Sequence, residues 1–174
     1  MGARQCSYYS EEILHQILPA IVKHQYSSGL AQGVDSLCHR LTITGQRDTI
    51  GVIGNGLDVF YPSFNQKLQI KMAQKYLIIS EFPLGTAPQA FHFPMRNRII
   101  AVLCDTLLVT EAKRKSGSLI MANLALENNW NVLAVPSKIS APLSVGCNLL
   151  IQEGAKPVLN ANDVLEEFGY EVQL

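Results

Sequence analysis

The residues best suited to chemistry lie between a short apolar segment and the start of a helix. Thr106–Val109 (TLLV) has the length and character of a buried strand, and Lys113, Arg114 and Lys115 follow it. Ser116-Gly117-Ser118 then opens a helix, whose first backbone N–H groups lack partners within the helix. Cations and free N–H groups at the carboxyl end of a parallel strand favour an anion, typically phosphate. The segment therefore predicts a phosphate-binding site at residues 113–118.

A second group of polar residues, Arg96-Asn97-Arg98, precedes an apolar run. Two cations two positions apart on a helix do not share a face. We therefore expect one arginine to face a ligand and the other to form an ion pair within the protein. Asn97 can donate and accept hydrogen bonds, so contact with a ligand and a structural clamp are equally good interpretations.

Other titratable residues allow a catalytic interpretation but do not require it. Asp35 and His39 are four apart on a predicted helix, so they form either an acid/base dyad or, as we favour, a helix-stabilising pair. Glu81 and Glu111 end two predicted strands and can serve as catalytic carboxylates or pair with Arg96 or Arg98. The sequence contains no nucleophile elbow, Walker lysine motif or metal-ligand cluster. We therefore predict a binding protein without catalytic residues, cofactor or metal.

Strand and helix patterns alternate along the whole chain, which is typical of an α/β fold with a mostly parallel sheet. The predicted strands cover residues 26–31, 48–54, 76–80, 106–109, 131–135 and 157–159. Helices are predicted to begin at Ser10, at residues 33–35, at residue 64, at residues 116–118 and at residue 146, with a last one capped by Asn162 or Asp163. We find no linker or repeat, so we predict a single Rossmann-like, doubly wound domain over residues 1–174.

Composition narrows the class of protein. Hydrophobic residues make up 48% and charged residues 16% of the chain, which indicates a globular rather than a disordered protein. Fourteen cations balance fourteen carboxylates, which argues against a histone-like binder but allows a local basic patch. Four widely spaced cysteines without a CxxC motif fit a reducing compartment. With no apolar run of about 20 residues and no signal-peptide pattern, we predict a soluble cytoplasmic protein without membrane contact.

Short motifs in a fixed order point to a family. They are Gly2-Ala3-Arg4, SGLAQGVD with His39, GNGLD followed by Tyr61-Pro62, SEFPLGTAP, FPMRNRIIA, VTEA followed by KSGSLIMA, VPS, and GCNLLIQEGA. Each motif is weak alone, but together they are specific. The chain resembles the Rossmann-like core of the DprA/Smf family of DNA-processing proteins. The helical domain and the winged-helix domain that often flank this core are not expected in these residues.

The resemblance implies a function and a set of contacts. Members of the family bind and protect single-stranded DNA and load the RecA recombinase onto it during natural transformation. By resemblance, Arg4 in the Gly2-Ala3-Arg4 turn faces the ligand and Lys115 contacts the nucleic acid backbone. The full predicted DNA-binding set is Gly2, Ala3, Arg4, Arg96, Asn97, Arg98, Lys113, Arg114, Lys115, Ser116, Gly117 and Ser118. Phe82, Phe91, His92 and Phe93 either provide stacking surfaces or pack in the core.

The family also implies a homodimer through this core. Apolar residues in the last third of the chain are candidates for the interface, and they are Leu149, Leu150, Ile151, Leu165 and Phe168.

The alternative function is binding or hydrolysis of a small nucleotide. Related Rossmann-like phosphoribohydrolases are recognised by a PGGxGTxxE motif at the corresponding helix start. Here that position reads KSGSLIMAN, which lacks the glutamate. This difference favours binding over hydrolysis.

The start of the sequence gives one further expectation. Gly2-Ala3-Arg4 reads as the turn after a first strand, yet only Met1 precedes it. We expect the sheet to lack a central strand between residues 26–31 and 49–54, and the native gene product to begin upstream with a short β-branched apolar run. Otherwise the two flanking strands must pair directly, or a segment of another copy must fill the gap.

Overall fold

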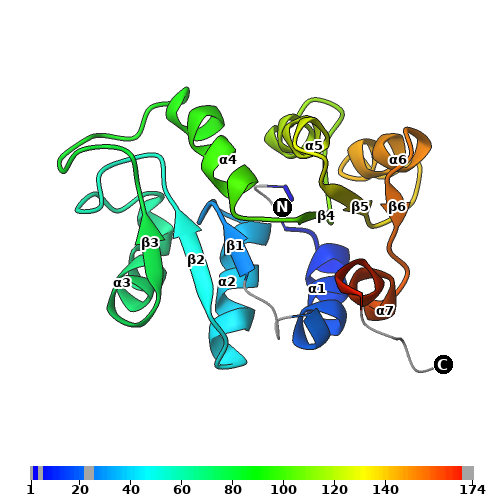
Figure 1. Cartoon of the computed structure of the whole chain (residues 1–174), viewed down its shortest axis with the longest axis horizontal. Helices are drawn as coiled ribbons and strands as arrows, with labels where there is room; N and C mark the ends of the chain where they lie inside the picture. Colours follow the sequence, from blue (N-terminus) through cyan, green and yellow to red (C-terminus); the bar gives the residue numbers. More distant parts are fainter. Residues whose placement is uncertain (1, 4–5, 22–25, 170–174) are drawn as a thin grey trace.

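Six short parallel strands form two sheets in the computed structural model, which describes residues 2–3, 6–21 and 26–169 (Figure 1). The first sheet has the order β1-β2-β3 and the second the order β4-β5-β6. The strands are β1 (Tyr26–Ser28), β2 (Thr49–Val52), β3 (Leu77–Ile79), β4 (Thr106–Val109), β5 (Asn131–Ala134) and β6 (Lys156–Pro157). Together the two sheets follow the strand order of a doubly wound Rossmann-like fold, divided between β1 and β4.

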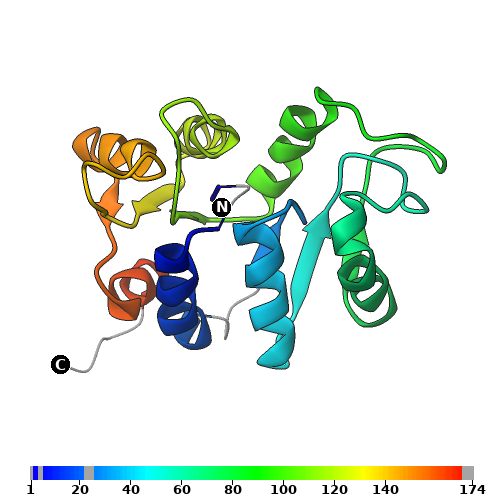
Figure 2. The ribbon, with the colours of Figure 1, turned by 180° about the vertical axis from the view of Figure 1, so that it is seen from behind.

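Helices cover both faces of the sheets and confirm the predicted α/β class. They are α1 (Tyr8–Ile21), α2 (Val34–Thr44), α3 (Gln66–Lys75), α4 (His92–Val102), α5 (Gly117–Glu127), α6 (Val145–Gln152) and α7 (Ala161–Leu165), with short 3-10 helices η1 (Ser63–Asn65) and η2 (Glu166–Phe168). Helices α1, α2, α3 and α7 lie on one face and α4, α5 and α6 on the other, as the two opposite views show (Figures 1 and 2).

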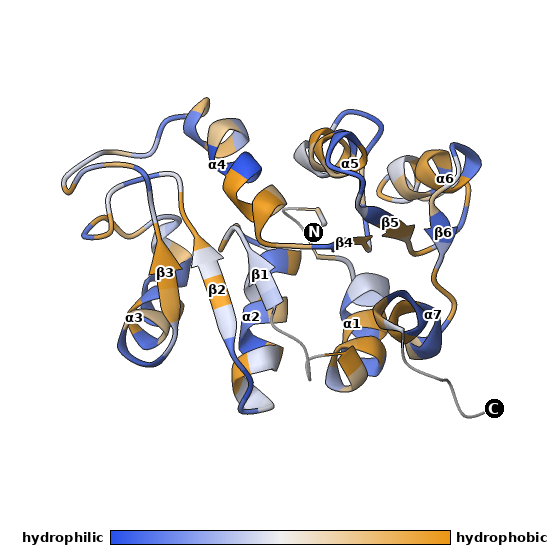
Figure 3. Cartoon of the chain, in the orientation of Figure 1, coloured by the Kyte–Doolittle hydropathy of each residue, from blue (hydrophilic) through white to orange (hydrophobic). Residues whose placement is uncertain are grey.

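The core follows from the apolar character of the strands. The largest cluster of buried side chains joins Val52 and Val109 of the sheets to Met121 of α5 and Leu150 of α6. On the opposite face, Leu133 of β5 belongs to a cluster with residues of α1 and α7. Strand β3 and the second half of α4 are hydrophobic in Figure 3, whereas the middle of α4 is hydrophilic. Strand β2 is buried at all four residues and β5 at three of its four, as expected for strands that are covered on both faces.

Two helix starts differ from the sequence-based prediction. Helix α1 begins at Tyr8 rather than after Ser10, because the Ser7 hydroxyl accepts a hydrogen bond from the Ser10 N–H at 3.2 Å. Helix α7 is capped by Asn160, whose side chain and that of Asp163 form a reciprocal capping box. In both cases a polar residue two or three positions earlier offers a better cap than the predicted one.

Two of the candidate dimer residues belong to the chain's own core. Leu150 is 4% exposed, and Ile151 packs against the same cluster. The apolar character of Leu150 is therefore explained within one chain, whereas Ile151 is only partly buried, and the dimer interface stays a prediction. None of the helices in the described ranges is both long enough and apolar enough to cross a membrane.

The sheet is interrupted at a different place from the one predicted. Strands β1 and β2 pair directly in parallel, with Ser27 opposite Ile50. The expectation of a missing neighbour between these two strands is therefore wrong, and the alternative of direct pairing holds. The interruption lies between β1 and β4, where the Ser27 hydroxyl is 2.6 Å from the Cys104 thiol sulfur. No strand within residues 26–169 or the two shorter described segments fills this position.

Gly2 and Ala3 lie beside the carboxyl ends of β1 and β4. The Val34 N–H donates to the Ala3 carbonyl at 3.4 Å, and the Ser118 hydroxyl donates to the Gly2 carbonyl at 3.2 Å. A Cβ atom added to Gly2 would lie 2.4 Å from a Val34 methyl carbon, so only glycine fits this close approach. This position agrees with the prediction of a turn that follows a central strand.

The facing edges of β1 and β4 predict that an added strand stabilises the fold. A Val/Ile-rich segment of about five residues, the usual strand length, joined before Gly2 should pair with both edges. We expect Tm to rise by several degrees, since each 1 kcal/mol shifts Tm by about 2–4 °C at this size. Calorimetry measures the shift. A Gly/Ser-rich extension of the same length is the control, and equal Tm values for both extensions would contradict the prediction that these two edges accept a strand.

Candidate nucleic-acid interface

A pocket of about 540 Å³ lies where the two sheets meet, at the carboxyl ends of β1, β2 and β4. This is the point where the strand order reverses, which is where open α/β sheets bind their ligands. Loops after the three strands provide most of its wall, with further residues from α4 and the start of α5. The polar and aromatic residues that line it are Gln32, Asp35, Asn55, Tyr61, Phe93, Arg96, Asn97, Lys113, Lys115, Ser116 and Ser118.

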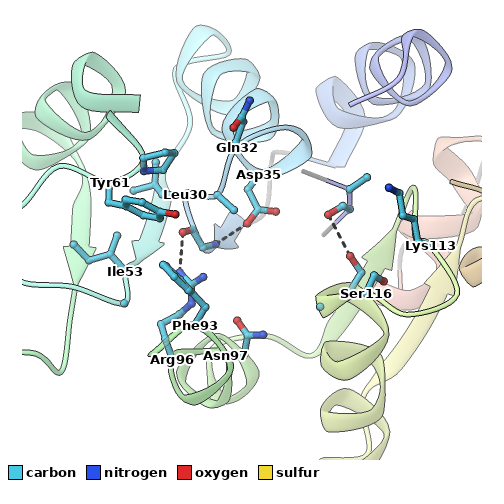
Figure 4. A pocket seen from close by; sticks show the side chains of 18 of the residues that line it. Leu30, Gln32, Asp35, Ile53, Tyr61, Phe93, Arg96, Asn97, Lys113 and Ser116 are labelled. Carbon is cyan, nitrogen blue, oxygen red and sulfur yellow. Dashed lines mark hydrogen bonds between the residues drawn. The ribbon is translucent and has the colours of Figure 1, made fainter. Parts of the chain in front are cut away.

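The two sides of the pocket differ in character (Figure 4). Lys113 and Ser116 lie on one side and Tyr61 and Phe93 on the other, with Asp35 and Asn97 between them. The chain therefore offers cations and aromatic rings to the same ligand from opposite directions. A phosphate group and a flat ring joined in one molecule, as in a nucleotide, match this division.

All of the predicted residues 113–118 except Arg114 line the cationic side of the pocket, and their contact with an anion stays a prediction. Lys113 and Lys115 are exposed and line the pocket, but Arg114, although exposed, does not line it. Gly117 and Ser118 also line it, at the first turn of α5. The Ser116 hydroxyl precedes α5, is buried, and has no hydrogen-bond partner among the described residues. Free donors and the positive end of α5 suit a phosphate oxygen.

The N-terminal residues of the predicted set reach the same pocket. Gly2 and Ala3 line it beside Ser118. Arg4 lies outside the described residues, so its predicted contact stays a prediction.

Arg96 forms the structural clamp rather than the exposed ligand contact. Its side chain lines the pocket but is 4% exposed. One guanidinium nitrogen donates to the Gly29 carbonyl at 2.8 Å and also to the Val52 carbonyl. Burial lowers the pKa of the guanidinium to about 10, and the Asp35 carboxylate partly opposes this shift. Arg96 thus ties the end of β1 to the end of β2.

The sequence left open which arginine forms an ion pair and whether Asn97 faces a ligand, and the structure separates Arg98 from Asn97 in this respect. Arg98 forms an exposed ion pair with Glu81 and does not line the pocket. Asn97 is buried and lines the pocket, and its side chain makes no hydrogen bond to any described residue. The adjacent positions of one helix therefore hold a clamp, a free amide in the pocket, and a surface ion pair.

Two aromatic rings form the wall opposite the lysines. Tyr61 and Phe93 stack with ring centroids 5.5 Å apart and an interplanar angle of 30°. Phe93 was among the predicted aromatic residues, whereas Tyr61 was missed as a ligand contact. The Tyr61-Pro62 step soon after β2 was the sequence feature that could have indicated this contact. Phe82 instead stacks on His92, and Phe91 is 62% exposed and does not line the pocket.

Asp35 and His39 do not form a dyad. Asp35 lines the pocket and accepts a hydrogen bond from the Gly29 N–H at 3.2 Å. His39 is buried outside the pocket, with Nδ1 2.7 Å from the Thr49 hydroxyl. Asp35 and His39 also share no hydrogen bond in the described structure, so they do not form the helix-stabilising pair that we favoured. Asp35 acts on His39 only through its charge.

Glu111 has a structural partner. Its carboxylate accepts hydrogen bonds from the backbone N–H and the hydroxyl of Ser7, and it is 4% exposed. Of the two predicted strand-end carboxylates, Glu81 therefore pairs with Arg98 as expected, and Glu111 fixes the start of α1.

Comparison with known proteins identifies the family of this chain. The model of the DNA recombination-mediator protein A family matches residues 1–169. The chain belongs to this family. It is 44% identical over 171 residues to the DNA processing protein DprA of Streptococcus pneumoniae and 40% identical over 169 residues to that of Bacillus subtilis. These alignments cover 98% and 96% of this chain but 61% and 57% of the two relatives.

Solved structures of family members share the fold. The crystal structure of Streptococcus pneumoniae DprA superimposes with a TM-score of 0.91 at 42% identity, covering 99% of this chain and 61% of that one. Helicobacter pylori DprA gives a TM-score of 0.88 at 28% identity, covering 98% and 80%. That structure is described as showing a unique single-stranded DNA binding mode. The resemblance to the DprA/Smf family and the Rossmann-like fold are thus confirmed.

The clamp predicts a large difference between two neighbouring arginines. Arg96→Met leaves the Gly29 and Val52 carbonyls without their charged donor and should lower the free energy of unfolding by about 3 kcal/mol. Arg98→Met removes an exposed ion pair and should cost less than about 1 kcal/mol. Urea denaturation of both variants measures the difference. Equal losses would show that Arg96 is not the clamp.

Burial of His39 predicts a loss of stability in acid. Desolvation lowers the pKa of His39 from 6.5 to about 4, so below pH 6.5 the unfolded chain binds a proton that the folded chain does not. The free energy of unfolding should therefore fall by about 3 kcal/mol on this account as the pH drops from 7 to 4. Urea titrations over this range should give a flatter pH dependence for His39→Gln. An unchanged slope in the variant would contradict the assignment.

Proposed function

We propose that this chain binds single-stranded DNA in the pocket between the two sheets and acts in DNA processing during recombination. The observation that carries the proposal is the combination of Lys113, Lys115 and the unpartnered Ser116 hydroxyl at the start of α5. The family supports it, as does the described single-stranded DNA binding mode of the Helicobacter pylori relative.

The chemistry of the pocket suits an unpaired nucleotide. Lysine ammonium groups and helix N–H groups hold a phosphate of any sequence, whereas an aromatic face stacks on a base only when the base is free of its partner strand. The Tyr61–Phe93 wall lines the pocket, where it can stack on an unpaired base. This arrangement favours single strands over double strands.

We also propose three further properties on the basis of the family alone. They are protection of incoming DNA, loading of RecA, and assembly into a homodimer. The chain spans about 60% of the length of the first relatives compared, so activities of the whole protein are expectations for this chain. We also propose that binding involves no catalytic step, because Asp35 is engaged by backbone and His39 lies outside the pocket.

The second candidate is an enzyme for a small nucleotide. A pocket of about 540 Å³ has the volume of a typical small-molecule site, and Asp35 and Asn97 place polar groups within it. Incubation with nucleoside monophosphates discriminates the two functions. Release of free base would support the enzyme, whereas intact nucleotide together with oligonucleotide binding supports the proposed function.

We predict that binding prefers single-stranded over double-stranded oligonucleotides and weakens with salt. Each neutralised phosphate of a single strand contributes about −0.7 to the slope of log K against log salt, so a few contacts give roughly −2 to −4. Lys115→Gln should make the slope shallower by about 0.7. Fluorescence anisotropy at several salt concentrations measures both quantities.

Arg114→Gln is the matched control for this prediction. It removes an equal charge one position away, outside the pocket, and should leave the slope nearly unchanged. Equal affinity for single and double strands, or an equal effect of both variants, would overturn the assignment of the pocket.

A further inference from the structure

A second cationic surface lies beside the pocket, on α2, η1 and α3. Lys67 and Lys71 are four residues apart on α3 and both are exposed, so they share one face of the helix. Arg40 of α2 lies over the ring of Phe64, with its guanidinium carbon 5.9 Å from the ring centroid. We call Arg40, Phe64, Lys67 and Lys71 the α3 surface.

This surface is charged well beyond the chain as a whole. The chain has equal numbers of cations and carboxylates, but residues 63–75, which form η1 and α3, contain three cations and no carboxylate. Arg40, Lys67 and Lys71 form no ion pair with any described residue. Their charges are therefore free to attract an anionic partner.

Buried hydrogen bonds fix the α3 surface to the wall of the pocket. Asn65, which is 1% exposed, donates to the Leu30 carbonyl at 2.9 Å and to the Ser36 hydroxyl at 2.6 Å. Leu30 lines the pocket, as do Tyr61 and Pro62 just before η1. The exposed ring of Phe64 and the first turn of α3 therefore follow the pocket wall directly along the chain. A bound nucleic-acid strand that leaves the pocket over Tyr61 would reach this surface next.

The composition of the surface indicates nucleic acid rather than protein. Lysine is depleted in protein–protein interfaces, whereas lysines with an exposed aromatic ring are typical of surfaces that hold single strands. Phe64 is 67% exposed, and one face of its ring can stack on a base while Lys67 and Lys71 contact phosphates. The two lysines are about 6 Å apart along the helix axis, so they can contact different phosphates.

We propose that the α3 surface is a second contact for the same single strand, which holds the backbone of the segment that leaves the pocket over Tyr61. This inference rests on the proposed function of the pocket and extends it to the length of strand that one chain contacts. The surface contributes affinity only when the oligonucleotide is long enough to reach beyond the pocket.

Two oligothymidylates of different length test the proposal. A probe of about two nucleotides matches the pocket of about 540 Å³, and one of about 20 nucleotides extends past it. The double variant Lys67→Gln/Lys71→Gln should bind the short probe like the wild type. For the long probe it should make the salt slope shallower by about 1.4, because two phosphate contacts are lost. Phe64→Ala should weaken the long probe alone, by roughly tenfold.

Arg47→Gln is the control, because Arg47 is exposed and precedes the amino end of β2, at the sheet edge opposite the pocket. It should leave both probes unaffected. If the wild type binds neither probe, the proposed function fails. If the wild type binds both and the double variant leaves the long probe unchanged, only the second contact is overturned. Equal weakening of both probes in the double variant also overturns it, because the lysines then act on the pocket itself.

Discussion

One buried guanidinium holds the pocket in shape. Arg96 donates to the carbonyl of Gly29, just after β1, and to that of Val52, the last residue of β2, and so links the two strands where their ladder stops. A Cβ atom on Gly29 would lie 2.3 Å from this guanidinium, so the glycine is required by the clamp. Asp35 accepts from the Gly29 N–H and supplies the nearby negative charge. A buried cation with these partners costs less than its isolated burial would.

The clamp also decides the electrostatics of the pocket. Because Arg96 and Asp35 are near each other at its base, their charges offset one another, and the attraction for an anion comes from the exposed Lys113 and Lys115. The cationic side therefore lies at the rim, and the interior presents amide and aromatic groups. A chain without net charge can attract an anion in this way, since the local arrangement of charges, rather than their sum, sets the potential at the site.

Much of this was predictable from the sequence, and the reasons differ from residue to residue. The strands and the cationic loop at 113–118 follow from local patterns, because a buried parallel strand must be apolar and a helix start must expose N–H groups. The roles of Arg96 and Arg98 were not separable, since which of two cations on a helix is buried depends on packing against β2. Tyr61 was missed because its stacking partner Phe93 is distant in sequence. The position of the sheet interruption required knowledge of which strands pair.

That interruption has a consequence for the ligand. Binding sites in doubly wound sheets lie where neighbouring helices depart to opposite faces, and here the same place also lacks a described strand. Gly2 and Ala3 occupy the carboxyl side of the gap, held by Val34 of α2 and Ser118 of α5. The two sheets are thus joined at the pocket by hydrogen bonds of loop and helix residues instead of a shared ladder. A ligand that contacts Lys115 on one side and Tyr61 on the other bridges both halves, so binding and the relative position of the sheets are thermodynamically coupled.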